Sequence, residues 1–497
     1  MDLRLKQERV EYHGCVLDRT AEDVFTSDVV VPDTLEDVGE IVLADGDFCL
    51  WRLDLGSGSA EAEGEWKGSV CYRAETDGSL QQFPVSVGIR LRIHDDAIEP
   101  NLKPWASCRV SEHTVQIMNT RKLRLKLRAS MTLQCYAMQT MELTSGAEEA
   151  PADLFFKTEQ HTASFVTDVS EQMFTAGERI RLQQAPEGKR ILASHSEVQF
   201  DPPQRSGSRA ILHGAVRTDL LYQSSETKQP VFETVNTTFS QLLELDQLTD
   251  KDTVGCHLQL TSADLILHEG EDLETEFHLV AQTRCIRDTE LRYLSDAYSV
   301  NDALEIETEP LNCVKMCEPE TLTVYAEGEQ TDAPDAVTLF SASAMLSSVK
   351  TALDSVSGTV EVTALFIDAD GCLVSRCIEA SFTQQLPCGA TVTEIHLGQP
   401  ITTTAASGLK VRLPVQLTCE RSEAFNANQI ISLERAEGQD ERDCLPSITL
   451  IPYTENLDLW ETAKQFGSTT DAIRAANTRN DGEKQPKYCI IPRVKVG

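Results

Sequence analysis

The sequence has few basic residues for its length. Its 497 residues include 44 Lys and Arg against 79 Asp and Glu, which gives a formal net charge of −35 at pH 7. Such an excess of negative charge repels nucleic-acid phosphates and anionic lipid surfaces. We therefore expect no nucleic acid among the partners of this chain.

Long apolar runs are also absent. No stretch approaches the roughly 18 consecutive apolar residues of a membrane-spanning helix. The first nine residues, MDLRLKQER, carry charges where a secretory signal needs an apolar segment. We expect a cytoplasmic chain that is neither exported nor membrane-spanning, and 15 cysteines that are mostly reduced thiols in the core.

Catalytic and cofactor motifs are missing as well. An enzyme needs a nucleophile, a base and an oxyanion or metal group that converge. The sequence contains no G-x-S-x-G, H-E-x-x-H, P-loop or glycine-rich dinucleotide turn, and its ten histidines are scattered. We expect a protein without enzymatic activity, with no catalytic residues, no metal and no cofactor.

What the sequence does contain is a threefold internal repetition. The pattern G-x-[WV]-x(5)-[YF] occurs at 64–72, 214–222 and 358–366. A shorter segment with an aromatic residue before a small hydroxyl residue precedes each copy, at 22–26, 171–175 and 295–299. Mostly structural roles are expected for these residues, because glycine and aromatic residues at such spacing serve strand packing.

Downstream of each copy lies a run of alternating apolar and polar residues that ends on a cysteine. The runs are 123–135, 273–285 and 409–419. Period two over this length predicts a long strand with one buried face. The first two copies keep an offset of 150 residues from Gly64 and Gly214 to Cys135 and Cys285. This offset indicates duplication.

The repetition predicts a mainly β, multidomain protein whose repeats are sandwiches or barrels. Polar stretches, most of them with Gly or Pro, mark the expected boundaries at 145–152, 287–290 and 436–446. The expected domains are three β-rich repeats and a small α/β module, at 1–145, 153–287, 290–435 and 446–497.

The C-terminal segment predicts a strand, two helices and a closing strand. Asp458 with Glu461 can cap a first helix, Gly467 can end it, and Ser468 with Asp471 can cap a second. The βααβ order resembles the LysM domain. The segments that carry the resemblance are Leu459-Trp460, 463–467 (AKQFG), 473–477 (IRAAN) and Ile491-Pro492.

The LysM resemblance implies a groove for polymers of N-acetylglucosamine, near 454–458 and 479–481. Asn456 and Leu457 stand where the family has Gly and Asp, which weakens the expectation of sugar binding. The candidate partner- or glycan-binding residues are Asn456, Leu457, Asp458, Trp460, Lys464, Phe466 and Asn477.

Three such repeats followed by a LysM module resemble the SPOCS-domain spore-coat morphogenetic proteins of spore-forming Clostridia. The resemblance implies a scaffold in the mother-cell cytoplasm, at the forespore surface, whose LysM module recruits the coat morphogenetic ATPase SpoIVA. The alternative is a peptidoglycan-binding LysM protein in which the repeats serve as a spacer.

The polar faces of the first two long strands carry opposite charge. Basic residues occupy one face, and acidic residues stand at the same offset in the second repeat. They are Lys122, Arg124, Lys126 and Arg128, against Asp272, Glu274 and Glu276. These are either two solvated surfaces or a repeat–repeat contact, within one chain or between self-associating chains.

Overall fold

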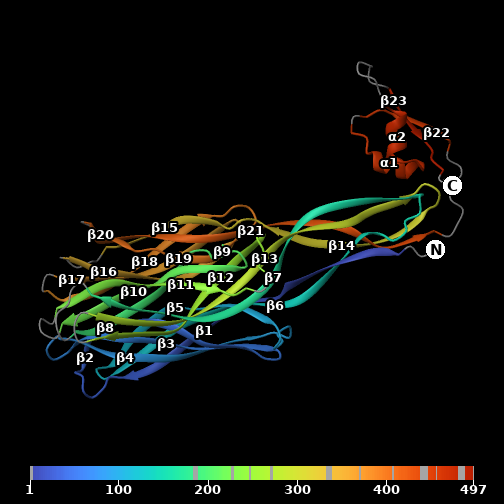
Figure 1. Ribbon diagram of the computed structural model, residues 1–497. Helices are drawn as coiled ribbons and strands as arrows, with labels where there is room; N and C mark the ends of the chain where they lie inside the picture. The colour runs from blue at the N-terminus through green and yellow to red at the C-terminus, as the bar shows by residue number, and fades with distance from the viewer. Residues whose placement is uncertain are drawn as a thin grey trace.

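The protein is mainly β, with several antiparallel sheets (Figure 1). This computed structural model describes residues 4–495 except 183–188, 225–228, 246–247, 269–271, 332–337, 369–370, 406–407, 437–445, 455 and 479–486. Within these residues, the helices are α1 (Leu459–Phe466) and α2 (Thr470–Ala476).

The first unit, residues 5–147, consists of two three-stranded sheets with the orders β1-β6-β5 and β2-β3-β4. The strands are β1 (Leu5–Val30), β2 (Val38–Leu55), β3 (Ser59–Ala74), β4 (Leu80–His94), β5 (Lys103–Asn119) and β6 (Lys122–Ala147). Leu17, Trp66 and Leu127 belong to one buried cluster fed by both sheets. The two sheets therefore pack face to face.

The second unit, residues 154–299, has the same order of strands. Its sheets are β12-β13-β7 and β11-β10-β8, with the short β9 on β10. The strands are β7 (Leu154–Arg181), β8 (Lys189–Phe200), β9 (Gln204–Ser206), β10 (Arg209–Ser224), β11 (Pro230–Leu243), β12 (Asp252–Leu267) and β13 (Asp272–Ser299). In both units the first and last strands pair with each other.

The third unit, residues 304–435, joins its strands in the order β14-β21-β15-β18-β17-β16, with β19 and β20 on β21. The strands are β14 (Leu304–Met316), β15 (Glu320–Gln330), β16 (Thr338–Ala352), β17 (Ser355–Ile367), β18 (Leu373–Gln385), β19 (Ala390–Leu397), β20 (Ile401–Ala405) and β21 (Gly408–Arg435). β14 and β15 both pair with β21 and are separated by a stretch containing Pro319, which has no N–H for a strand ladder.

The alternating runs form the predicted long strands with one buried face. They lie in β6, β13 and β21. The alternate side chains of the first run, from Leu123 to Cys135, are at most 1% exposed. Those from Leu273 to Cys285 and from Leu409 to Cys419 are at most 3% exposed. The prediction from period two is confirmed.

The glycine pattern lies on β3, β10 and β17, and each of these strands is paired on both sides, by β2 and β4, by β8 and β11, and by β16 and β18. A Cβ at Gly214 would lie 2.5 Å from the Phe239 ring and 2.5 Å from a backbone oxygen of β8. Gly64 and Gly358 lie in the same way beneath Phe48 and Phe382. These glycines are needed because a phenylalanine ring of a neighbouring strand covers each of them.

The structure differs from the sequence expectation at the start of the third unit. Residues 287–290, an expected boundary, lie inside β13, where they pair with β7. Residues 295–299, expected to open the third repeat, form the end of the same strand. A half-exposed two-stranded ribbon needs the same polar residues as a linker, and the sequence pattern does not separate the two.

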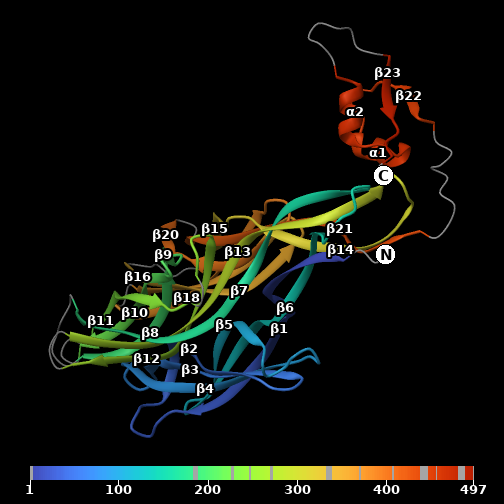
Figure 2. The same cartoon turned by 45° about the vertical axis from the view of Figure 1, so that its right-hand side comes forward.

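The long strands of each unit continue beyond the sheets as ribbons that run together (Figures 1 and 2). We call this bundle the stalk. Its buried cluster draws on all three units and consists of Leu143, Ala163, Phe165, Leu291, Tyr293, Leu311 and Cys313. A second cluster follows toward the C-terminal module and includes Leu154, Leu294, Ile430 and Leu433. The apolar stalk therefore holds the three units together.

Glutamine side chains also connect the units. β5 is an edge strand, and its backbone N–H groups at Ala106 and Cys108 donate to Oε1 of Gln282 and Gln259, at 2.9 and 3.3 Å. In the stalk, Thr144 donates to Oε1 of Gln429 at 3.0 Å. These bonds satisfy backbone groups that an open sheet edge would leave unpaired.

The C-terminal module consists of β22 (Ile448–Pro452), α1, α2 and β23 (Tyr488–Pro492), in that order. Asp458 caps α1, and Gly467 ends it with a φ of 61°, as predicted. α2 is capped by Thr469 instead of Ser468, because Ser468 is fully buried and its hydroxyl donates to the Pro492 carbonyl. No helix among the described residues is long and apolar enough to cross a membrane.

Candidate functional sites

The C-terminal module docks on the end of the β7–β13 ribbon. Asp296 of β13 accepts a hydrogen bond from Trp460 Nε1 at 2.7 Å. The same carboxylate receives Lys464 Nζ at 2.7 and 2.8 Å from its two oxygens. Two of the candidate partner-binding residues therefore already bind a carboxylate of this chain.

Tyr298, two residues further along β13, inserts into the module. Its hydroxyl donates to the Ser468 carbonyl at 3.1 Å, and its ring meets Trp460 edge-on with centroids 4.8 Å apart. The Phe155 ring stacks on the Tyr298 ring, with centroids 5.4 Å apart. Tyr298 and Val300 share one buried cluster with Ala463 and other side chains of the module. The stalk thus completes the core of the module.

The electrostatics of Asp296 fit a built contact. Burial raises the pKa of this carboxyl, but the hydrogen bonds from Lys464 and Trp460 outweigh burial and lower it overall. The Lys464 and Asp296 side chains are 35% and 20% exposed. A charge-assisted pair with this limited access to water is worth more than an exposed surface ion pair.

Most other candidate residues of the module have structural roles. Asn477 holds α2 to β23, because its amide exchanges hydrogen bonds with the backbone of Ile490 at 2.7 and 2.8 Å. Asp458 caps α1, while Leu457 and Phe466 pack against the core. Asn456 is exposed. The expected second edge of the groove, 479–481, lies outside the described residues.

One face of the β22–β23 sheet exposes large apolar side chains. The inward face carries Cys489 and Ile491, which are 4% and 1% exposed. The outward residues are 39–62% exposed and consist of Ile448, Leu450, Tyr488 and Ile490. An apolar strand face of this kind is typical of a surface that another molecule covers.

The two charged stripes are each paired locally. Arg124 and Lys122 bind Asp28 at 2.7 and 2.8 Å, and Arg128 binds Glu22 and Glu112 at 2.6 and 3.0 Å. The acidic stripe has its own partners. Asp272 pairs with Arg179, Glu274 with His268, and Glu276 with His278. Among the described residues, none of these ion pairs joins the basic stripe to the acidic one, and a contact between the stripes of two chains stays a prediction.

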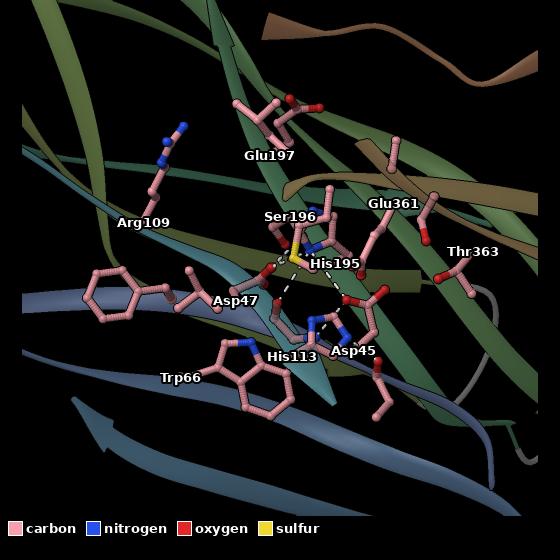
Figure 3. A pocket seen from close by; sticks show the side chains of 18 of the residues that line it. Asp45, Asp47, Trp66, Arg109, His113, His195, Ser196, Glu197, Glu361 and Thr363 are labelled. Carbon is pink, nitrogen blue, oxygen red and sulfur yellow. Dashed lines mark hydrogen bonds and ion pairs between the residues drawn. The ribbon is translucent and has the colours of Figure 1, made fainter. Parts of the chain in front are cut away.

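A cavity of about 670 Å³ lies where the three units meet. Its lining includes Asp45 and Asp47 of β2, His113 of β5, His195 of β8 and Glu361 of β17 (Figure 3). The units also share an apolar cluster that includes Val42, Leu192 and Leu365. Val42 lines the cavity as well, so charged and apolar side chains lie side by side at the junction of the units.

An ion pair crosses the cavity wall between units one and two. His195 Nδ1 lies 3.3 Å from Asp47 Oδ1 and 3.6 Å from Asp45 Oδ1. The Ser196 N–H donates to Asp47 at 2.7 Å. Burial disfavours the charged imidazole, but Asp45 and Asp47 outweigh burial and raise the His195 pKa to about 10. The two carboxylates favour the charged imidazole, which suits a clamp and not a general base.

Glu361 faces the same cavity from unit three. Burial raises its pKa, and the nearby Glu112 and Glu379 raise it further. Glu379 lies directly opposite Glu361 in the strand ladder. Like charges at this spacing repel each other. In the part of the chain that the structure describes, no group of three His, Cys, Asp or Glu side chains is arranged to hold a metal ion.

The cavity residues belong to none of the sequence motifs that predicted a functional site. A signal was present, since Asp45-Gly46-Asp47 and Ser194-His195-Ser196 interrupt apolar strand patterns. Polar residues inside such strands imply a buried polar partner. The sequence does not show that these two segments are each other's partners, because they lie about 150 residues apart.

The comparisons with known proteins give no relative for this chain. No family model matches it, and no curated protein or solved structure does.

Proposed function

We propose that this chain is a non-enzymatic adaptor in bacterial endospore coat assembly, of the kind represented by SipL, with SPOCS-type repeats and a LysM-type module. The observation that carries the proposal is the place of the C-terminal module at the far end of the stalk (Figure 2). A recognition module held away from a large body suits a protein that links two partners.

The proposed partner of the module is a SpoIVA-like coat morphogenetic ATPase in the mother-cell cytoplasm, at the forespore surface. The exposed apolar face of Ile448, Leu450, Tyr488 and Ile490 supports a protein partner. The charge of the module supports it too, because residues 446–497 hold seven basic and six acidic residues in an otherwise strongly acidic chain. The module can approach an acidic surface that the body repels.

Binding of the purified ATPase tests the proposal. The full chain should bind, and a chain ending at Arg435 should not. Leu450→Asp should weaken binding, whereas Leu353→Asp, at a residue 89% exposed on the body, should not. Equal binding by the full and shortened chains would refute recruitment by the module. Sedimentation with insoluble peptidoglycan, lost on shortening, would instead favour the glycan-binding alternative.

A further inference from the structure

The end of the β7–β13 ribbon is preorganised for the contact with the module. Asp153 accepts the Ser299 hydroxyl at 2.7 Å, and Arg435 binds Asp153 at 3.2 Å. The Ser299 hydroxyl in turn accepts the N–H groups of Asn301 and Asp302 at 3.1 Å each. These bonds fix the ribbon end and hold Asp296 and Tyr298 in position.

The contact uses two of the candidate partner-binding residues of the module. Lys464 and Trp460 carry the positive charge and the largest aromatic surface of α1, and both are bound to Asp296. A partner cannot use these groups while Asp296 and the Tyr298 ring occupy them. Its binding through α1 must displace the ribbon end or compete with it.

The connection between stalk and module permits such a displacement. Twelve residues separate Arg435 at the end of β21 from Ile448 at the start of β22. A chain of this length spans up to about 40 Å when extended. The covalent link therefore does not force the module to remain on the ribbon end.

We propose that the ribbon end is an autoinhibitory lock, in which Asp296 and Tyr298 occupy the partner-binding side of α1 until an acidic partner displaces them. The inference rests on the proposed function. The partner supplies a carboxylate for Lys464 and an apolar surface for Trp460, the same chemistry that the ribbon end supplies. Only released modules can bind the partner. The apparent affinity for the partner is therefore the intrinsic affinity multiplied by the fraction of modules that are released.

The test uses the full chain and the purified ATPase. Asp296→Ala removes the acceptor of Trp460 and Lys464, and Asp296→Arg also repels Lys464. Asp288→Ala is the matched control, because Asp288 lies on the same strand and bonds Ser164 instead of the module. Both Asp296 variants should bind the ATPase about tenfold more tightly than the wild type and the control. Lys464→Ala should bind more weakly.

Hydrogen exchange in 459–466 gives a second readout that needs no partner. Exchange should rise in both Asp296 variants and stay unchanged in Asp288→Ala. Unchanged exchange would overturn the lock, as would equal or weaker ATPase binding by the Asp296 variants. If neither the wild type nor any variant binds the ATPase, both the proposed function and the lock are refuted. If the wild type and all variants bind the ATPase equally, the lock is refuted and the proposed function is not.

Discussion

Unit one builds its core from its own strands, whereas the C-terminal module depends on residues of another unit. The buried cluster of unit one lies entirely between Leu17 and Cys135. In the module cluster, Ala463, Ile473, Cys489 and Ile491 are joined by Tyr298 of β13 and by Val300, which follows the end of that strand. A segment of about 50 residues buries too little apolar surface to be very stable alone. The comparison teaches that docking adds to the stability of the module.

The largest expected effect is on the self-contained core. Leu127 is fully buried in β6, and Leu127→Ala should lower the free energy of unfolding by about 2–5 kcal/mol. Guanidinium unfolding measures the loss. Lys126→Ala, on the opposite and exposed face, is the control and should stay within about 0.5 kcal/mol. Similar losses for both would contradict the core assignment.

The dependence of the module on the stalk predicts a local loss. Tyr298→Ala should destabilise the module by about 3 kcal/mol, because it removes a fully buried ring, and leave the three units folded. Faster hydrogen exchange in 459–476, with unchanged exchange in β6, would show this. Met173→Ala, at a residue of β7 that is 74% exposed, is the control. Unchanged exchange in Tyr298→Ala would mean that the module has a sufficient core of its own.

A pair of glycine substitutions compares the packing inside unit two with that of unit one. Gly214→Ala should cost about 1–3 kcal/mol, because the new methyl group would lie 2.5 Å from both the Phe239 ring and the Gln199 carbonyl. Gly88→Ala in β4 is the matched control, since no atom lies within 4 Å of its Cβ position. Thermal unfolding of both variants measures the difference. Equal melting temperatures for Gly214→Ala and Gly88→Ala would argue against a tight contact between Gly214 and the Phe239 ring.

The ion pair between units one and two predicts that the free energy of unfolding depends on pH. The His195 pKa is raised from 6.5 to about 10, so its stabilising effect is full below about pH 6.5 and disappears as the pH rises through about 10. The difference in denaturant midpoint between wild type and His195→Gln should therefore shrink from pH 6 to pH 10. A constant difference would show that the ion pair with Asp47 does not matter.

The smallest effect is expected at the basic stripe. Arg128→Ala removes ion pairs with Glu22 and Glu112, whose side chains are 50% and 27% exposed. The melting temperature should fall slightly at low salt and match the wild type in 1 M salt, because exposed ion pairs are weak and screened. A loss that persists in high salt would point to packing instead of charge.

The sequence predicted the strands whose pattern is local. Period two identified β6, β13 and β21, and the capping residues identified α1 from Asp458 to Gly467. These features depend on residues a few positions apart, where propensity and pattern operate. The burial of Leu127 and its neighbours follows from the same pattern.

Contacts between distant segments could not be predicted from the same patterns. Lys464 was identified as a candidate, but its partner Asp296 lies 168 residues earlier, in a stretch expected to open the third repeat. Likewise, nothing local pairs His195 with Asp47. The sequence indicates that such polar side chains need partners, and only the packing of the units specifies which.

The pairing of first and last strands in each unit has a consequence for synthesis of the chain. Leu5 pairs with Ala147, Leu154 with Ser299, and Leu304 with Arg435. At translation rates of 5–20 residues per second, Leu5 at the start of β1 waits roughly 7–28 s for Ala147 to be synthesised. Contacts of this sequence separation also form slowly. Each unit therefore closes late, and the rate of translation sets the earliest moment at which the stalk can assemble.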